Sequence, residues 1–136
     1  MIKPELYLNL EIGSDTKNIS MILDMLPNNI DGVKYYNIGD IRERDNGVYK
    51  ESFYRYRYYD HEAFYANMFV ERLLEMISLE RLKKIISFGF DVLLVFNILF
   101  EQQNDFFSIP DAGLSAKLMK TLGDLGIDYH VNIDFY

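Results

Sequence analysis

The sequence predicts an α+β fold, a two-layer sandwich in which a mostly antiparallel sheet of about five or six strands carries three helices on one face. Two observations lead to this prediction. Several segments alternate apolar and polar residues with a period of two, which is typical of strands buried on one side. Between them lie segments whose apolar residues recur every three or four positions, as in helices that bury one stripe. Elements with one apolar face are satisfied by packing helices against a sheet.

The amino-terminal part predicts a strand, a helix and a second strand. Residues 5–12 alternate apolar and more polar side chains, which indicates a strand with one buried face. Ser14 or Asp15 can then cap a helix that continues to about Leu26. After a Pro-Asn-Asn break, residues 32–39 predict a short strand.

The stretch "SFYRYRYYDHEAFY", residues 52–65, combines aromatic and basic residues in a way that could suit single-stranded nucleic acid. The Asn46–Gly47 pair before it favours a tight turn into a strand. In a strand, alternation separates its side chains into two sets. Tyr54, Tyr56 and Tyr58 share one face, whereas Phe53, Arg55, Arg57 and Tyr59 share the other. The stretch is therefore interpreted as an amphipathic strand, and nucleic-acid binding is not expected.

A long helical pattern and an apolar strand follow. Residues 61–86 show an apolar stripe at helical spacing, and Ser78 could interrupt this helix and cap a second segment. Gly89 is a plausible terminator. Residues 90–102 are apolar on both faces, which predicts a central strand.

The carboxy-terminal part predicts one more helix and one more strand. Ser115 fits an N-cap, and Gly126 fits the end of the helix that it starts. Residues 127–135 alternate apolar with polar side chains, as expected of a strand with two different faces.

Composition limits the class of protein. The 136 residues fit a single domain, 1–136, that is 49% apolar. The absence of cysteine excludes a thiol nucleophile, a disulfide and a thiolate metal site in this chain. No apolar run is long enough for a secretory signal or a membrane helix, so we expect a cytoplasmic protein with no membrane association. The formal charge of −7 repels nucleic acid and suits a basic partner.

Polar groups on the last strand raise the question of a metal site. Asp128, His130, Asn132 and Asp134 share one side of it. Oxygen and imidazole groups can ligate a divalent ion, but residues two apart on a strand are separated by about 6.6 Å. The alternation favours instead a solvated sheet face whose acids offset Arg55 and Arg57. No metal or cofactor is therefore assigned.

Catalytic motifs are weak in this sequence. Ser14 to Lys17 match a Ser-x-x-Lys pattern, but the companion motifs of that enzyme class are missing and a helix cap explains the serine better. No nucleophile is marked beside His130, and no phosphate-binding glycine loop is present. We therefore expect a protein that is not an enzyme and assign no catalytic residues.

The long strand also predicts an aliphatic patch. Leu93, Val95 and Leu99 would lie on the sheet face that the helices leave uncovered. A mixed patch of this kind suits protein binding or self-association. Cover by a loop, such as residues 39–48 or 102–113, is an equally good explanation.

The tail "IPDAGLSAKLMKTLGDLGIDYHVNIDFY", with "LERLKKIISFGFDVLLVFNILF" before it, resembles the bacterial domain of unknown function 4279. The likeness covers the order of elements and an "IDIY"-like final strand, here Ile133 to Tyr136. Where many members have a tryptophan, this chain offers Phe53 or Tyr54. The resemblance implies a small bacterial α+β domain without assigned catalytic residues, and some similar proteins are suspected toxin-immunity proteins.

These observations predict a non-catalytic cytoplasmic protein-binding domain, with an immunity protein that neutralises a basic toxin as the specific hypothesis. The expected partner-binding residues are Arg55, Arg57, Tyr7, Glu11, Asp128, His130 and Asp134. Two alternatives stay open. One is a metal- or small-molecule-dependent enzyme or sensor that uses the exposed face of the last strand. The other is a homodimer whose exposed sheet face is the subunit interface.

Overall fold

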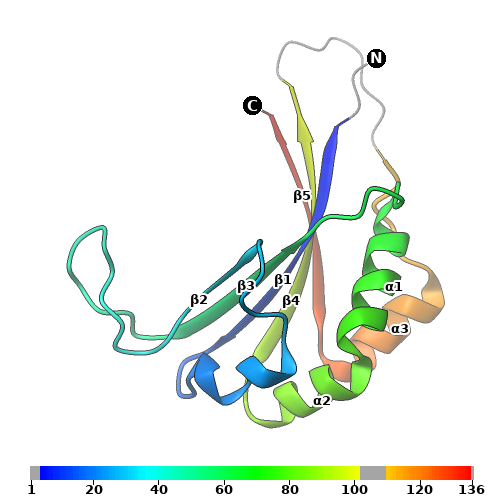
Figure 1. Cartoon of the computed structure of the whole chain (residues 1–136). Coiled ribbons are helices and arrows are strands. Elements are labelled where there is room, and N and C mark those ends of the chain that lie inside the picture. Colours follow the sequence, from blue (N-terminus) through cyan, green and yellow to red (C-terminus); the bar gives the residue numbers. More distant parts are fainter. Residues whose placement is uncertain (1–3, 102–109, 136) are drawn as a thin grey trace.

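The protein folds into one five-stranded mixed sheet covered by helices on one face, as a computed structural model shows for residues 4–101 and 110–135 (Figure 1). The strands are β1 (Glu5–Ser14), β2 (Val33–Tyr36), β3 (Ser52–Tyr58), β4 (Asp91–Phe100) and β5 (Asp128–Phe135). The helices are α1 (Ala66–Ile77), α2 (Leu79–Ser87) and α3 (Ala116–Leu125). This arrangement confirms the α+β prediction. Among the described residues, none of the helices combines the length and apolar character needed to cross a bilayer.

The sheet has the order β2-β3-β1-β4-β5, with β1 at its centre. Three neighbouring pairs are antiparallel, and β4 and β5 are parallel. The parallel pair follows from the chain order, because α3 lies between these two strands in sequence and returns the chain to the same end of the sheet. The mostly antiparallel sheet predicted from the sequence is thus observed.

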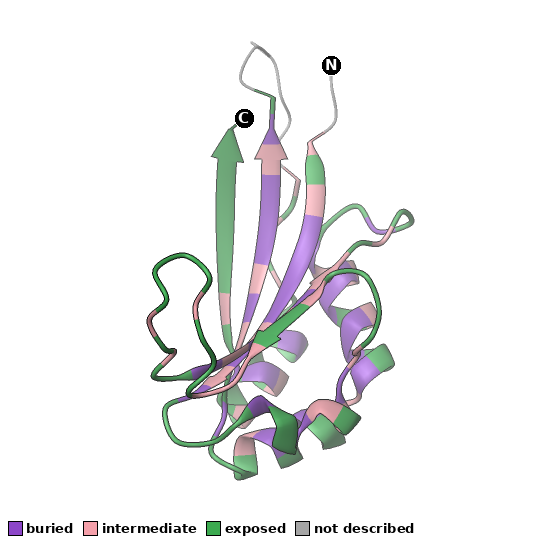
Figure 2. Ribbon diagram, turned by 60° about the vertical axis from the view of Figure 1, so that its left-hand side comes forward, coloured by how far each residue is buried: buried purple, intermediate pink, exposed green. Residues whose placement is uncertain are grey.

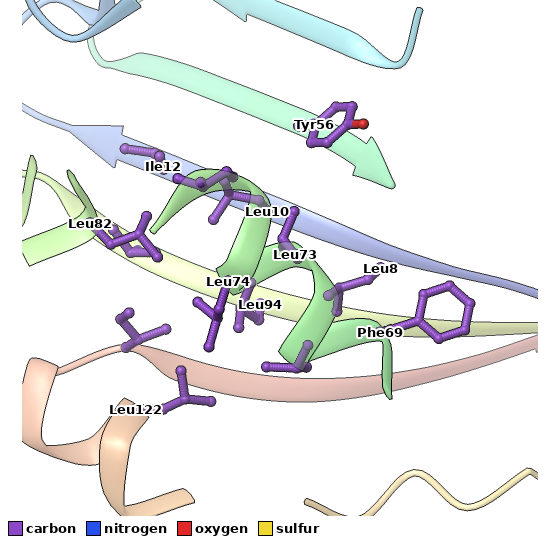
Figure 3. Packing of buried hydrophobic residues seen from close by; sticks show 14 of the residues in the cluster. Leu8, Leu10, Ile12, Tyr56, Phe69, Leu73, Leu74, Leu82, Leu94 and Leu122 are labelled. Atoms are coloured by element: carbon purple, nitrogen blue, oxygen red, sulfur yellow. The ribbon is translucent and has the colours of Figure 1, made fainter. Parts of the chain in front are cut away.

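The core lies between the sheet and the helices. Leu8, Leu10 and Ile12 of β1 are fully or almost fully buried, and Leu10 is paired with Tyr56 on one side and Leu94 on the other. The helices place Phe69, Leu73, Leu74, Leu82 and Leu122 against this layer (Figure 3). Each such side chain contributes about 1.5–3 kcal/mol when fully buried, so the helix-covered face supplies most of the stability.

The helix predicted for residues 15–26 is wrong. This segment contains two short 3-10 turns, Ile19–Met21 and Leu23–Met25. The physical reason is a tertiary contact at Asn18, whose side-chain oxygen accepts a hydrogen bond from the backbone N–H of Ile38 at 3.0 Å. Asn18 itself is extended, so the helix cannot start where the sequence pattern placed it.

The long central helix is two helices, as the position of Ser78 suggested. Ser78 has a positive φ of 80°, which breaks the helical path, and its Oγ accepts a hydrogen bond from Arg81 N at 3.3 Å to start α2. The first helix begins at Ala66 rather than near His61. Ser115 and Gly126 flank α3 as predicted, because the Ser115 Oγ accepts from Leu118 N and Gly126 is left-handed.

Candidate binding surface

The face of the sheet opposite the helices is the candidate site, and we call it the open face. The register sorts its side chains into rows that cross the sheet from β3 through β1 and β4 to β5. One row contains Arg55, Glu11, Leu93 and Asp128, and the next contains Arg57, Asn9, Val95 and His130. Further along lie Tyr7, Asn97 and Asn132, then Glu5, Leu99 and Asp134.

Five of the seven sequence-predicted residues fall into two groups at opposite sides of this face, and Tyr7 and Glu11 lie between them on β1. The arginines lie on β3, and Lys34 of β2 is directly opposite Arg55. Asp128, His130 and Asp134 lie on β5, with β1 and β4 between the two groups. The open face is consequently basic on one side and acidic on the other.

The arginines of the open face form no ion pair with the acidic residues of this face that the structure describes. Glu11 is directly opposite Arg55 in the register, yet neither Arg55 nor Arg57 forms an ion pair within the described residues. The Nε atoms of both arginines are buried and have no hydrogen-bond partner in the described part of the chain. A buried unpaired N–H costs about 1–3 kcal/mol, so these two atoms lower the stability of the free protein.

Lys34, Arg55 and Arg57 form what we call the basic cluster. Together with Gly32 and Val33 they line a pocket of about 130 Å³ at the β2–β3 edge of the open face. Like charges directly opposite each other on neighbouring strands are destabilising, and Lys34 and Arg55 have this arrangement. The sequence did not indicate Lys34, because which strands are neighbours cannot be deduced from alternation alone.

Tyr7 supports the basic cluster and is itself covered. Its side chain is only 7% exposed, and the Arg57 guanidinium lies over its ring at 4.6 Å. Tyr59 packs beside it with ring centroids 5.4 Å apart and donates a hydrogen bond to Glu5 Oε1 at 3.2 Å. The cation–π contact holds Arg57 in place, and Arg57 also forms a hydrogen bond with the Tyr59 side chain. Tyr7 therefore positions Arg57 and presents little surface of its own.

Asparagines fill the middle of the open face. Asn97 is buried, donates to Val95 O at 3.0 Å and accepts from Asn132 Nδ2 at 3.1 Å. Asn9 is also buried, and its Oδ1 has no partner within the described residues. These amides run between the basic and acidic sides as a polar strip, with half-buried Leu93, Val95 and Leu99 around them.

The β5 group is exposed and spread along the strand. Asp128, His130 and Asp134 are all exposed, and their neighbours on β4 are the aliphatic Leu93, Val95 and Leu99. In the part of the chain that the structure describes, no three His, Asp or Glu side chains are placed to hold a metal ion. Among the described residues, the neighbours of these three side chains on β4 therefore add no ligand for the alternative of a metal-dependent site.

A groove beside the basic cluster was not predicted. It has a volume of about 1130 Å³ and runs between β2, β3 and the loop of residues 39–49. The Tyr36 and Tyr49 rings stack at 3.5 Å inside it, and Phe53 lies 5.7 Å from Tyr36. Charged side chains also line it, namely Lys34, Asp40, Glu43, Arg44 and Arg55.

The sequence offered two loops, residues 39–48 and 102–113, as possible covers for the aliphatic patch. Residues 39–48 lie against β2 and β3, where several of them line the groove. Residues 102–109 are outside the described part of the chain, and residues 111 and 112 contact the helical side through Ala66 and Tyr129. The described parts of these loops thus leave Leu93, Val95 and Leu99 half-buried.

Comparisons with protein-family models, with curated proteins and with solved structures found no match to this chain. The resemblance to the domain of unknown function 4279 therefore stays a prediction.

Proposed function

We propose that this protein is a non-catalytic protein-binding domain that receives its partner on the open face. The observation that carries the proposal is the basic cluster, in which the guanidinium groups of Arg55 and Arg57 lie beside Lys34 and form no ion pair within the described residues. A carboxylate of a partner would accept from these guanidinium groups and offset the Lys34–Arg55 repulsion. Hydrogen bonds between guanidinium and carboxylate are about twice as strong as neutral ones.

The charge distribution gives the partner a chemistry. Acidic groups of the partner lie over the basic cluster, and basic groups lie over Asp128 and Asp134 on β5. The strip of Leu93, Val95 and Leu99 supplies apolar contact between these two charged ends. Arginine and tyrosine are common anchors of such interfaces.

The specific form of the proposal is a toxin-neutralising immunity protein in the cytoplasm. The net charge of −7 accelerates the capture of a partner with overall positive charge, as many nucleic-acid-cleaving or membrane-active toxins would have. The open face then orients the complex, because its basic cluster accepts only an acidic part of that partner.

Capture of a partner from the source cell, followed by a toxin-rescue assay with neighbouring genes, tests this function. The double variant Arg55→Ala/Arg57→Ala should weaken binding at least about tenfold, since each lost charge-assisted hydrogen bond is worth about 1.5–3 kcal/mol. The matched control is Arg81→Ala/Lys83→Ala, which removes the same charge from exposed positions of α2. Equal loss in both variants, or no loss in either, would contradict the proposed surface. No captured partner and no rescue would contradict the proposed function.

A further inference from the structure

The β5 strand is an edge of the sheet in the part of the chain that the structure describes. It is eight residues long, and in the described part of the chain it pairs only with β4. Every residue of it except Tyr129 is exposed (Figure 2). Edge strands present unpaired backbone N–H and C=O groups that can pair with another strand, and proteins usually shorten, bend or charge such an edge. The charged residues of β5, Asp128 and Asp134, lie on its open face, and the helix side of its described residues carries no charge.

The apolar row of β5 extends beyond the helices. Val131, Ile133 and Phe135 point to the same side as the core but are 42%, 44% and 46% exposed. Figures 1 and 2 show this end of β5 projecting past the helical layer. The side chains of Val131 and Ile133 are therefore only partly covered at an edge where another strand could extend the sheet, while Phe135 stacks on Phe100 with ring centroids 5.6 Å apart.

We propose that β5 pairs in antiparallel fashion with β5 of a second copy of this chain, around a two-fold axis at Asn132. This two-fold axis runs perpendicular to the sheet and keeps odd residues opposite odd residues. Val131 then lies opposite Ile133 of the other copy, and Asn132 lies opposite its own equivalent. The two five-stranded sheets become one sheet of ten strands.

This register is self-complementary, which is the reason for naming a second copy as the occupant. It also places Tyr129 opposite Phe135, so that the helix-side row is apolar throughout. On the open face it places His130 of each copy opposite Asp134 of the other, where an imidazole N–H can donate to a carboxylate. Opposite-charge and apolar cross-strand pairs each contribute about 0.2–1 kcal/mol, and every such pair occurs twice in the dimer.

Neighbouring registers are worse. An axis at Val131 would place Asp128 opposite Asp134 twice, and directly opposed like charges are destabilising. An axis at Ile133 would remove the His130–Asp134 pair and leave only residues 131–135 of the described strand paired. The sequence of β5 thus selects the axis at Asn132.

Single-cysteine trapping tests the register, since the chain has no cysteine of its own. Opposed residues on antiparallel strands have Cβ atoms about 4.5–5.5 Å apart, close to the separation that a disulfide spans. Asn132→Cys should therefore form a covalent dimer on mild oxidation. The control Asp128→Cys lies on the same strand and face, but its two copies would be eight positions apart, roughly 26 Å. Similar trapping of both variants, or trapping of neither, would overturn the proposal.

Charge exchange tests the same pairing in the reversible dimer, measured by sedimentation equilibrium. His130→Asp should weaken the dimer about tenfold or more, because it opposes acids at two symmetric positions. The double variant His130→Asp/Asp134→Lys should restore association, since it makes two opposite-charge pairs. A wild-type chain that stays monomeric over the accessible concentration range, or a double variant no better than the single one, would overturn the proposal. A strand of another protein, rather than a second copy, would then be the remaining occupant of this edge.

Discussion

The two faces of β3 lie in different environments. Tyr54 and Tyr56 point toward the helices, whereas Arg55 and Arg57 point to the open face. On the covered face the polar atom of Tyr54 is satisfied, because its hydroxyl donates to Pro27 O at 2.7 Å. On the open face the Nε atoms of both arginines are buried without a partner among the described residues. The buried hydroxyl on the covered face is thus paired within the chain, whereas the open face carries two guanidinium groups that form no ion pair among the described residues.

The largest loss of stability is expected for a substitution on the face of the sheet that the helices cover. Phe96 is fully buried and meets the edge of Phe69 with ring centroids 5.4 Å apart. Phe96→Ala should lower the free energy of unfolding by about 3–5 kcal/mol, through lost burial and a remaining cavity. Denaturant unfolding measures this loss. The control is Leu99→Ala on the same strand, whose side chain points to the open face and is only half-buried. Equal losses at the two positions would remove the difference between the faces.

A smaller loss of stability is expected for a substitution at the junction of β3 and α1. The Asp60 carboxylate accepts hydrogen bonds from Tyr58 Oη at 2.7 Å and from Arg72 Nη1 at 2.9 Å. Asp60→Asn should cost about 1–2 kcal/mol of unfolding free energy, because it weakens charge-assisted bonds at a mostly covered side chain. Glu62→Gln is the matched control, since Glu62 is 84% exposed at 3.5 Å from the same Arg72. A surface pair of this kind contributes little, so equal losses would contradict the role of Asp60.

The same junction predicts a pH dependence. Burial alone would raise the Asp60 pKa, but the hydrogen bonds from Tyr58 and Arg72 outweigh burial and lower it. A lowered folded-state pKa stabilises the protein above the unfolded value, near 4, and this contribution is lost as the pH falls through the folded value. The difference in stability between wild type and Asp60→Asn should therefore shrink in acid. A difference that stays constant down to the acid unfolding transition would show that the charge is unimportant.

The fold was more predictable from the sequence than the site. Strands such as residues 5–12 were found because alternation reports directly on one buried face. The helix predicted for residues 15–26 was wrong and the basic cluster was missed, and each has a physical reason. Asn18 bonds to Ile38 N, a contact 20 residues away that no local pattern contains. The basic cluster depends on Lys34 facing Arg55, which requires knowledge of strand neighbours.

The alternation of β3 correctly placed Arg55 and Arg57 on a common face, so this part of the site could be predicted from the sequence. It also placed Asp128, His130 and Asp134 together on β5. The distance between these two groups of residues could not be predicted, because it depends on the order of the strands in the sheet. The acids of β5 lie too far away to pair with the arginines, since β5 is three strands away from β3, and Glu11 of β1 is opposite Arg55 but forms no ion pair with it.

An effect of about 1 kcal/mol is expected for a single hydroxyl on the covered face. Tyr54→Phe removes the hydroxyl that donates a hydrogen bond to Pro27 O, so this carbonyl loses that donor. Burial raises the pKa of Tyr54, which agrees with a hydroxyl held away from water. Tyr35→Phe is the control, because Tyr35 on the neighbouring β2 is 47% exposed. Thermal unfolding of the two variants should separate them, and identical melting temperatures would mean that the buried bond contributes nothing.

The smallest effect on stability, within about 0.5 kcal/mol and of either sign, is expected for Arg55→Met. The methionine keeps apolar packing while it removes a buried unpaired N–H and the repulsion from Lys34. Binding of the partner should nevertheless fall, so that stability and recognition respond in different ways at this position. The comparison variant is Arg72→Met, which loses stability because Arg72 is paired with Asp60 in the free protein. If Arg55→Met were as destabilising as Arg72→Met in chemical denaturation, Arg55 would already have its partner within the chain. The reason for expecting a partner outside the chain would then disappear.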